Sequence, residues 1–171
     1  MVEMIVESVR ISASGVQRVV VLKSKEDDRY LLIWVGTPEA SAIALSMQGV
    51  AVARPMTHDL LRNVVEALGG TVRQVLVNDL VDNTYYARLI VDVDGRTIEI
   101  DSRPSDAIAL AVRTQATILV DEKVLAEAGI KPTDEGKKGD EADLAVFRDF
   151  INSLGADDAS SPEQGNDRLS S

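Results

Sequence analysis

The sequence predicts an α+β fold with a mixed sheet, in one compact domain of about seven strands and three to four helices over residues 1–130. Near-continuous apolar runs at Arg18–Leu22 and Tyr30–Val35 are typical of buried strands. Helices that begin at Thr37-Pro38 and at Pro104 alternate with such strands. A helix-to-strand alternation of this kind favours a sheet covered by helices over a helical bundle or a sandwich.

The first half of the domain reads as three strands followed by two helices. Residues 2–12 predict a strand, and the two apolar runs that follow predict a hairpin with a charged turn, Lys25–Arg29. A helix begins at Thr37 and ends at Gly49. A second helix begins at Thr57 and carries one apolar stripe. That stripe consists of Leu60, Leu61, Val64, Val65 and Leu68.

The second half of the domain reads as further strands and helices. Residues 71–77 predict a strand, and Asp94-Gly95 predicts a type I′ hairpin between residues 85–93 and 96–101. The turn fixes the register, so that Val91 faces Ile98, Leu89 faces Ile100 and Arg88 faces Asp101. Beyond it we expect a helix to Thr114, a strand over 117–120 and a helical turn over 124–128.

One short motif occurs twice. Ala42-Ile-Ala-Leu45 recurs as Ala107-Ile-Ala-Leu110, each time just after a strand and the start of a helix. The repeat indicates either a degenerate β-β-α duplication or a chance match of four common residues.

The last forty residues differ in character from the domain. Residues 131–143 have the composition of a linker. Leu144, Phe147, Ile151 and Leu154 then lie at spacings of three and four, which predicts a short amphipathic helix over 144–154. Residues 155–171 are polar and predict a disordered tail.

Composition narrows the function classes. The chain has 171 residues and a net charge of −10. It contains no cysteine, and this excludes disulfides, thiol catalysis and cysteine-bound zinc. The sequence contains no apolar run long enough to span a bilayer and no basic signal-peptide start, so we expect a cytoplasmic protein without membrane contact. Binding of long nucleic acid needs a basic face, and no Lys/Arg cluster occurs. Any nucleic-acid contact must therefore be local, transient or assisted by metal ions.

Walker, GxGxxG, HExxH and GxSxG patterns are absent, so candidate chemistry rests on polar residues at helix starts and strand ends. His58, the single histidine, suits a general base or a metal ligand, or else a local hydrogen bond at a helix start. Glu39, Asp59 and Asp106 each lie in a first helical turn, where carboxylates complement the helix dipole. If Glu39 and Asp106 converge, they could instead hold a divalent cation.

The arginines allow two interpretations as well. Arg103, Asp106 and Arg113 share a helix face and could clamp phosphate or form a plain salt-bridge network. Asp101 is explained by an ion pair with Arg88 as readily as by catalysis. Arg54, in an extended stretch near the histidine, suits either a phosphate contact or an ordinary surface position.

Two separate motifs, in the right order, resemble the bifunctional nuclease family. The first comprises Ile33-Trp-Val-Gly36, Glu39-Ala40, Ala42–Leu45, Arg54-Pro55 and Thr57–Leu60, and the second comprises Ile100–Ala111 with Arg113. The resemblance covers about residues 2–130. It implies an α/β-type domain that self-associates and cleaves both DNA and RNA. The motif residues, carried over by position, are Glu39, Arg54, His58, Asp59, Asp101, Arg103, Asp106 and Arg113.

Two functional hypotheses follow. As a metal-assisted phosphodiesterase, the protein would use His58, Asp59, Arg103 and Asp106 in catalysis, Arg54 and Arg113 to bind substrate, and Glu39, Asp101 and Asp106 to hold Mg²⁺ or Mn²⁺. As a non-catalytic module, it would be a homo-oligomer that binds a protein or a small ligand, with structural arginine–aspartate pairs. The catalytic hypothesis requires these side chains to share one cleft.

Overall fold

The computed structural model describes residues 1–12, 15–132 and 141–158. The chain forms two units, Met1–Lys138 and Gly139–Ser171. All strands and the first four helices belong to the first unit, and a fifth helix belongs to the second.

The described strands form one mixed sheet, as the sequence predicts. Their order across the sheet is β3-β2-β1-β7-β4-β5-β6, and all pairs are antiparallel except β4 with β7. The strands are β1 (Val2–Ile11), β2 (Arg18–Ser24), β3 (Tyr30–Val35), β4 (Gly70–Val81), β5 (Thr84–Val93), β6 (Arg96–Ser102) and β7 (Thr117–Val120). The α+β fold class is therefore confirmed.

The sheet contains two three-stranded antiparallel meanders, one on each side of β7. The first, β1–β3, leads into helix α1 (Thr37–Met47), and the second, β4–β6, leads into helix α3 (Pro104–Thr114). The repeated Ala-Ile-Ala-Leu motif lies in these two helices. The recurring unit thus has three strands where the sequence analysis expected two, because β1 pairs with β2 in the same way that β4 pairs with β5.

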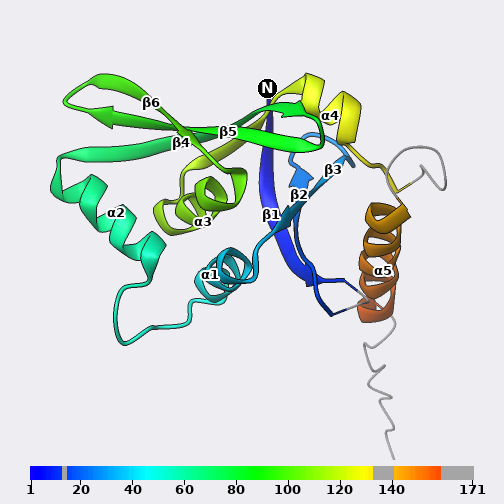
Figure 1. The fold of residues 1–171 in the computed structure, drawn as a ribbon. Helices are drawn as coiled ribbons and strands as arrows, with labels where there is room; N and C mark the ends of the chain where they lie inside the picture. Colours follow the sequence, from blue (N-terminus) through cyan, green and yellow to red (C-terminus); the bar gives the residue numbers. More distant parts are fainter. Residues whose placement is uncertain (13–14, 133–140, 159–171) are drawn as a thin grey trace, which may run out of the picture. The chain divides into compact units, whose positions relative to one another are not determined.

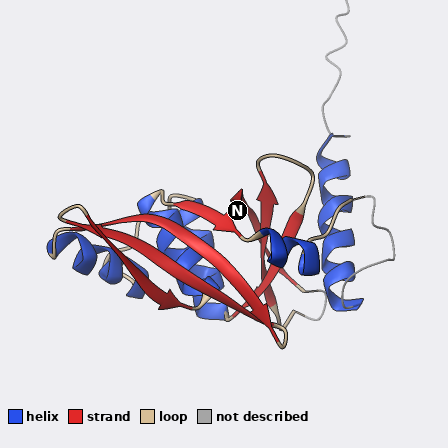
Figure 2. Ribbon diagram, turned by 90° about the horizontal axis from the view of Figure 1, so that it is seen from above, coloured by secondary structure: helices blue, strands red, loops and turns tan. Residues whose placement is uncertain are grey.

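Helices α1 and α3, together with α2 (Thr57–Ala67), lie on one side of the sheet (Figure 1). Seen from above, the strands lie in front of these helices (Figure 2). α3 is buried almost throughout, and its alanines allow close approach to α1. Val65 of α2 packs against the core, but most of its predicted apolar stripe stays exposed in the described structure. The exposed members are Leu60, Leu61, Val64 and Leu68.

The predicted hairpin at Asp94-Gly95 is confirmed. Both residues have positive φ, 52° and 74°, as a type I′ turn requires. Val91 pairs with Ile98 and Arg88 with Asp101 in the ladder. The expected ion pair between Arg88 and Asp101 is wrong, because Nη1 of Arg88 donates to Oε2 of Glu99 at 2.7 Å. Glu99 is the diagonal neighbour on the same face, within reach of a long side chain.

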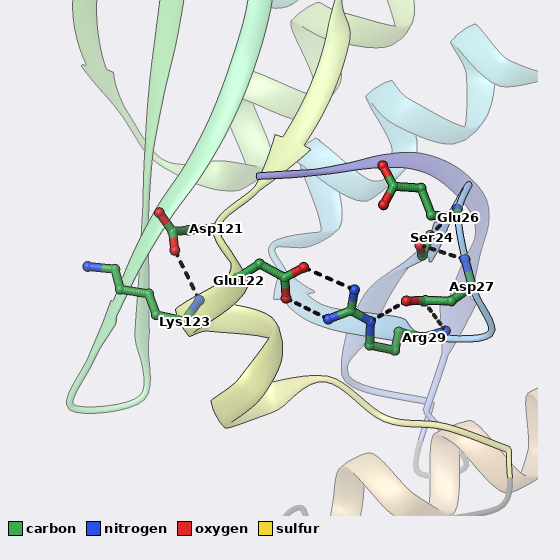
Figure 3. Close-up of polar contacts among 7 residues, drawn as sticks. All are labelled: Ser24, Glu26, Asp27, Arg29, Asp121, Glu122 and Lys123. Atoms are coloured by element: carbon green, nitrogen blue, oxygen red, sulfur yellow. Dashed lines mark hydrogen bonds and ion pairs between the residues drawn. The ribbon is translucent and has the colours of Figure 1, made fainter.

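The charged turn between β2 and β3 is tied to helix α4 (Glu122–Ala128), as Figure 3 shows. Both terminal nitrogens of Arg29 donate to Glu122, at 2.7 and 3.2 Å, while its Nε donates to Asp27. Asp121 caps α4 by accepting a hydrogen bond from the backbone N–H of Lys123 at 3.0 Å.

In the second unit, helix α5 spans Glu141–Asp158. The predicted helix over 144–154 lies within it, and the rings of Phe147 and Phe150 have centroids 6.2 Å apart. α5 also takes in residues 141–143 of the expected linker and residues 155–158 of the expected tail. Residues 133–140 and 159–171 lie outside the described residues. Among the described helices, none combines the length and apolarity that a bilayer crossing requires.

Candidate functional site

The first turns of α1, α2 and α3 meet on the helix-covered side of the sheet. α1 and α3 both begin with a proline near their N-termini, and neither N-terminus carries a side-chain cap. The residues preceding them, Gly36 and Arg103, are extended and lead directly out of β3 and β6. The sheet therefore delivers two helix starts with unused backbone N–H groups to the same place.

Four side chains from these helix starts form a continuous hydrogen-bonded cluster: Glu39, Arg103, Asp106 and His58. Nε2 of His58 lies 3.0 Å from Oδ1 of Asp106. Nε of Arg103 donates to Oδ2 of Asp106 at 2.7 Å, and its Nη2 donates to Oε1 of Glu39 at 3.0 Å. Residues 39, 58 and 106, far apart in the sequence, are thus held by one guanidinium and one imidazole.

The exposed fraction of the side chains increases along the cluster from His58 to Arg103. The His58 side chain is 9% exposed, Asp106 30% and Arg103 67%. Burial works against ionisation of Asp106, but hydrogen bonds from Arg103 and His58 outweigh it and hold the pKa of this carboxyl below its ordinary value. The hydrogen bonds that Arg103 donates to Asp106 and Glu39 raise the pKa of Arg103. Asp106 is therefore an ionised acceptor for the Nε2–H of His58, which leaves Nδ1 as the proton-accepting nitrogen.

Asp59 points away from this cluster although it is adjacent to His58. Its Oδ2 accepts a hydrogen bond from the Met56 backbone at 2.9 Å, and its Oδ1 accepts one from Nε of Arg113 at 2.6 Å. The hydrogen bond from the Met56 backbone lowers the pKa of Asp59 most. Burial raises this pKa, but the contact with Arg113 lowers it further, so the pKa lies below its ordinary value. Arg113 is only 5% exposed and also donates to the carbonyls of Ala109 and Ala42. The pair joins α1, α2 and α3.

Two predicted site residues lie outside both groups. Asp101 is exposed near the end of β6, and Arg54 is exposed in the loop between α1 and α2. Within the described part of the chain, neither makes a hydrogen bond or ion pair with the cluster. The structure thus joins Glu39, His58, Arg103 and Asp106, pairs Asp59 with Arg113 beside them, and leaves Asp101 and Arg54 apart.

The cluster offers two carboxylates to a cation. Across residues 1–12, 15–132 and 141–158, no three His, Asp or Glu side chains gather as potential metal ligands. Glu39 and Asp106 come together through Arg103, whose mostly exposed side chain stands between them. Mg²⁺ in phosphoryl-transfer sites is held by one or two carboxylates together with substrate phosphates and water. Glu39 and Asp106 are the residues that could hold a metal in that form, and Arg103 already pairs with both of them.

Gly36 lies next to the Glu39 carboxylate, and the sequence analysis named it only as part of the first family motif. A side chain at this position would collide with Oε2 of Glu39, so glycine leaves room for that carboxylate to fold back over the start of α1. The sequence shows a glycine directly before Thr37-Pro38-Glu39, but the reason for a glycine there cannot be inferred until the position of the Glu39 side chain is known.

Comparison with known proteins gives a consistent result. A family model described as the bifunctional nuclease domain matches residues 20–133. An uncharacterized protein of Mycobacterium tuberculosis is 42% identical over 163 residues, covering 91% of this chain and 96% of that protein. Bifunctional nuclease 1 of Oryza sativa subsp. indica is 30% identical, covering 71% of this chain and 38% of the rice protein. Bifunctional nuclease 2 of Arabidopsis thaliana is 33% identical, covering 69% of this chain and 37% of the Arabidopsis protein. The chain spans well under half the length of these plant relatives.

Proposed function

This chain belongs to the bifunctional nuclease family, and from that premise we propose that it hydrolyses phosphodiester bonds in DNA and RNA at the cluster of Glu39, His58, Arg103 and Asp106, which we call the catalytic cluster from here on. The observation that carries the proposal is the contact of 3.0 Å between His58 and an ionised Asp106, beside the exposed guanidinium of Arg103. A base, an orienting carboxylate and a phosphate-binding cation then stand within one hydrogen-bonded chain.

His58 acts as the general base. Asp106 accepts the Nε2–H hydrogen bond and so fixes the imidazole tautomer and its orientation. Nδ1 takes a proton from the attacking water as the new phosphorus–oxygen bond forms. The bond to the leaving oxygen then breaks, and that oxygen recovers a proton from the imidazolium or from solvent.

Arg103 binds the phosphate. Its side chain is the most exposed in the cluster, and Glu39 and Asp106 orient it from two sides. The uncapped first turns of α1 and α3 add backbone N–H groups and the positive ends of two helix dipoles. Charge that develops on the pentacoordinate phosphorus is stabilised by these preorganised donors. Arg54, exposed in the neighbouring loop, stays a predicted contact to a further phosphate.

We include divalent-metal assistance in the proposal. Mg²⁺ or Mn²⁺ would be held by Glu39 and Asp106 with phosphate oxygens, and would supply charge neutralisation against the acidic chain. Arg103 contacts Oδ2 of Asp106 and Oε1 of Glu39, so the metal would share these two carboxylates with Arg103 while Arg103 keeps its orientation towards the phosphate.

The test is cleavage of single-stranded DNA and RNA by identically purified variants. We expect His58→Gln and Asp106→Asn to lower kcat by about a hundredfold or more, because general-base catalysis contributes about 10²–10⁴. Glu127→Gln is the control, since it removes one exposed carboxylate in α4. EDTA, Mg²⁺ and Mn²⁺ arms test the metal. Equal residual cleavage by all variants would mean a contaminating nuclease and would reject the proposal in favour of the non-catalytic module.

We also propose that the protein self-associates through α2. Leu60, Leu61, Val64 and Leu68 form an exposed apolar stripe on an otherwise polar helix. Contiguous exposed apolar surface marks interaction sites more often than scattered single residues do. A second copy, which presents the same stripe, is the occupant we propose.

A further inference from the structure

A hollow of about 270 Å³ lies beside the catalytic cluster. It opens between the end of α1, the loop over residues 48–56, the start of α2 and the second half of α3. Its walls combine aliphatic and polar groups, and the polar groups come from Ser46, Asp59, Arg62 and Arg113. The aliphatic members are Leu45, Val50, Val52, Met56 and Val112.

The wall at Val50 is preformed by the end of α1. Gly49 adopts φ 64°, and its N–H donates to the carbonyl of Ser46, while the N–H of Val50 donates to that of Leu45. This is the Schellman arrangement, which folds the chain back over the last helical turn. Val50 and Val52 nevertheless remain 47% and 42% exposed. Their apolar surfaces face an opening that the described residues do not fill.

The hollow adjoins the first turn of α2. Met56 and Asp59, both in its lining, flank His58 in the sequence. Asp59 is fixed there by Arg113, and His58 reaches Asp106 from the same turn. A nucleic-acid strand whose phosphate lies at Arg103 would have to pass the first turn of α2 to place a nucleotide in this opening.

Arg62 supplies a cation at the far side. Its side chain is 36% exposed, its hydrogen bonds go to the adjacent Asn63, and its Nε is 3.9 Å from Glu66. A second hollow of about 220 Å³, lined in part by Thr71, Thr114 and Gln115, shares Arg62 with the first. Arg62 thus stands between two openings, where the phosphate that joins two nucleotides would lie.

We propose that the hollow at Val50 and Val52 is a nucleobase subsite, which takes an unpaired base next to the scissile phosphate while Arg62 contacts the following phosphate. This inference rests on the proposed nuclease function and names the form of its substrate, a single strand. A volume near 270 Å³ falls just below the range of pockets for drug-sized molecules, as suits a single base. The aliphatic members of the lining can lie against the face of any base, so we expect binding that is tolerant of sequence.

The expectation of a single-stranded substrate follows from the geometry of nucleobases. In a duplex, the face and the pairing edge of each base are covered, and only an unpaired base can turn into a side pocket. An acidic chain without a basic face also lacks the surface that a duplex backbone requires. Recognition through one base and two or three arginines is the alternative that this chain offers.

The test separates base binding from catalysis. Binding is measured by calorimetry with a dinucleoside phosphonate, in which a methylene group replaces the scissile ester oxygen, and with its abasic counterpart of equal charge. We expect the wild type to prefer the base-containing ligand by about fivefold, the lower end of what base contacts contribute. Val50→Ser should reduce this preference to about twofold or less. Val81→Ser, at an equally exposed valine at the end of β4, should retain it.

Hydrolysis of methyl p-nitrophenyl phosphate, which carries no base, reports on the catalytic cluster alone. We expect Val50→Ser to keep the wild-type rate on this diester, whereas His58→Gln loses it. Equal affinity of the wild type for the two phosphonates, or an unchanged preference in Val50→Ser, would overturn the nucleobase subsite even if the diester is cleaved. Absence of diester hydrolysis by the wild type, with the base preference intact, would instead count against the proposed function.

Discussion

Asp106 is the residue on which the catalytic cluster depends. Its two carboxylate oxygens hold different partners, His58 on Oδ1 and Arg103 on Oδ2, so ionisation of one group maintains both contacts. Because its pKa is lowered in the folded protein from an ordinary value of 3.8, the ionised form contributes stability. That contribution is complete above the unfolded-state pKa and is lost as the pH falls through the folded-state value.

We therefore predict that Asp106→Asn destabilises the protein most at neutral pH. The difference in the free energy of unfolding between wild type and variant should be largest above about pH 5 and should shrink as the pH falls below about 4. Urea unfolding at several pH values measures it. Glu127→Gln, which removes an exposed carboxylate in α4, is the control and should show no comparable dependence. A difference that stays constant from pH 7 to pH 3 would contradict the prediction.

At this scale the sequence indicated residue types but not partners. Carboxylates in first helical turns are expected for the dipole alone, so Glu39, Asp59 and Asp106 looked equivalent. Only the packing of three helices shows that Asp59 meets a buried arginine while the other two meet an exposed one. Adjacent positions, His58 and Asp59, face different partners because successive residues on a helix point about 100° apart.

At the scale of elements, the Asp59–Arg113 pair fixes the helix starts. Arg113 donates to α2 through Asp59, to α1 through the Ala42 carbonyl and to its own helix through Ala109. The start of α2 therefore cannot shift without breaking a buried ion pair. His58 depends on that position for its contact with Asp106. The sequence analysis expected Arg113 to bind substrate. Because Arg113 is only 5% exposed and donates to Asp59, Ala109 and Ala42, we infer that it positions the site.

We predict that Arg113→Met costs about 3–5 kcal/mol of stability, the typical loss when one partner of a buried pair is removed. The matched variant is Arg88→Met, which breaks the single ion pair with Glu99 on the surface. Arg88 and Glu99 are 51% and 54% exposed, so that loss should be about 1 kcal/mol or less. Chemical denaturation measures both. Similar losses for the two variants would show that Arg113 does not have the positioning role inferred from its burial.

Element boundaries show where pattern reasoning succeeds and where it fails. The hairpin at Asp94-Gly95 was predictable because glycine marks the turn. The turn at Asp82-Asn83 was not, although both residues have positive φ, 48° and 59°. Without glycine its signal is weak, and the polar residues before it hid the last four residues of β4. The predicted strand over 71–77 therefore ended too early.

At the scale of the whole molecule, a negative net charge is compatible with the proposed nucleic-acid site because that site is confined to one small cluster. With a net charge of −10, the chain cannot attract nucleic acid over a broad surface, so affinity must come from a few arginines at the helix starts and from apolar contact. The sequence predicted this restriction directly from composition. It could not predict which apolar residues would remain exposed, because a stripe at helical spacing looks the same whether it faces a core or solvent.

The apolar stripe of α2 gives the last prediction. If Leu60, Leu61, Val64 and Leu68 pack against a second copy, the wild type sediments above the 18.5 kDa of one chain, and Leu60→Lys with Leu68→Lys shifts it to that mass. Both leucines are exposed, so the double variant should fold, and an unchanged circular dichroism spectrum would show this. Val81→Lys, an exposed apolar residue on β4, is the control and should leave the mass unchanged. Sedimentation of the wild type as a monomer at micromolar concentration would exclude a stable dimer through α2. In that outcome the catalytic cluster would still stand, because Glu39, His58, Arg103 and Asp106 all come from one chain.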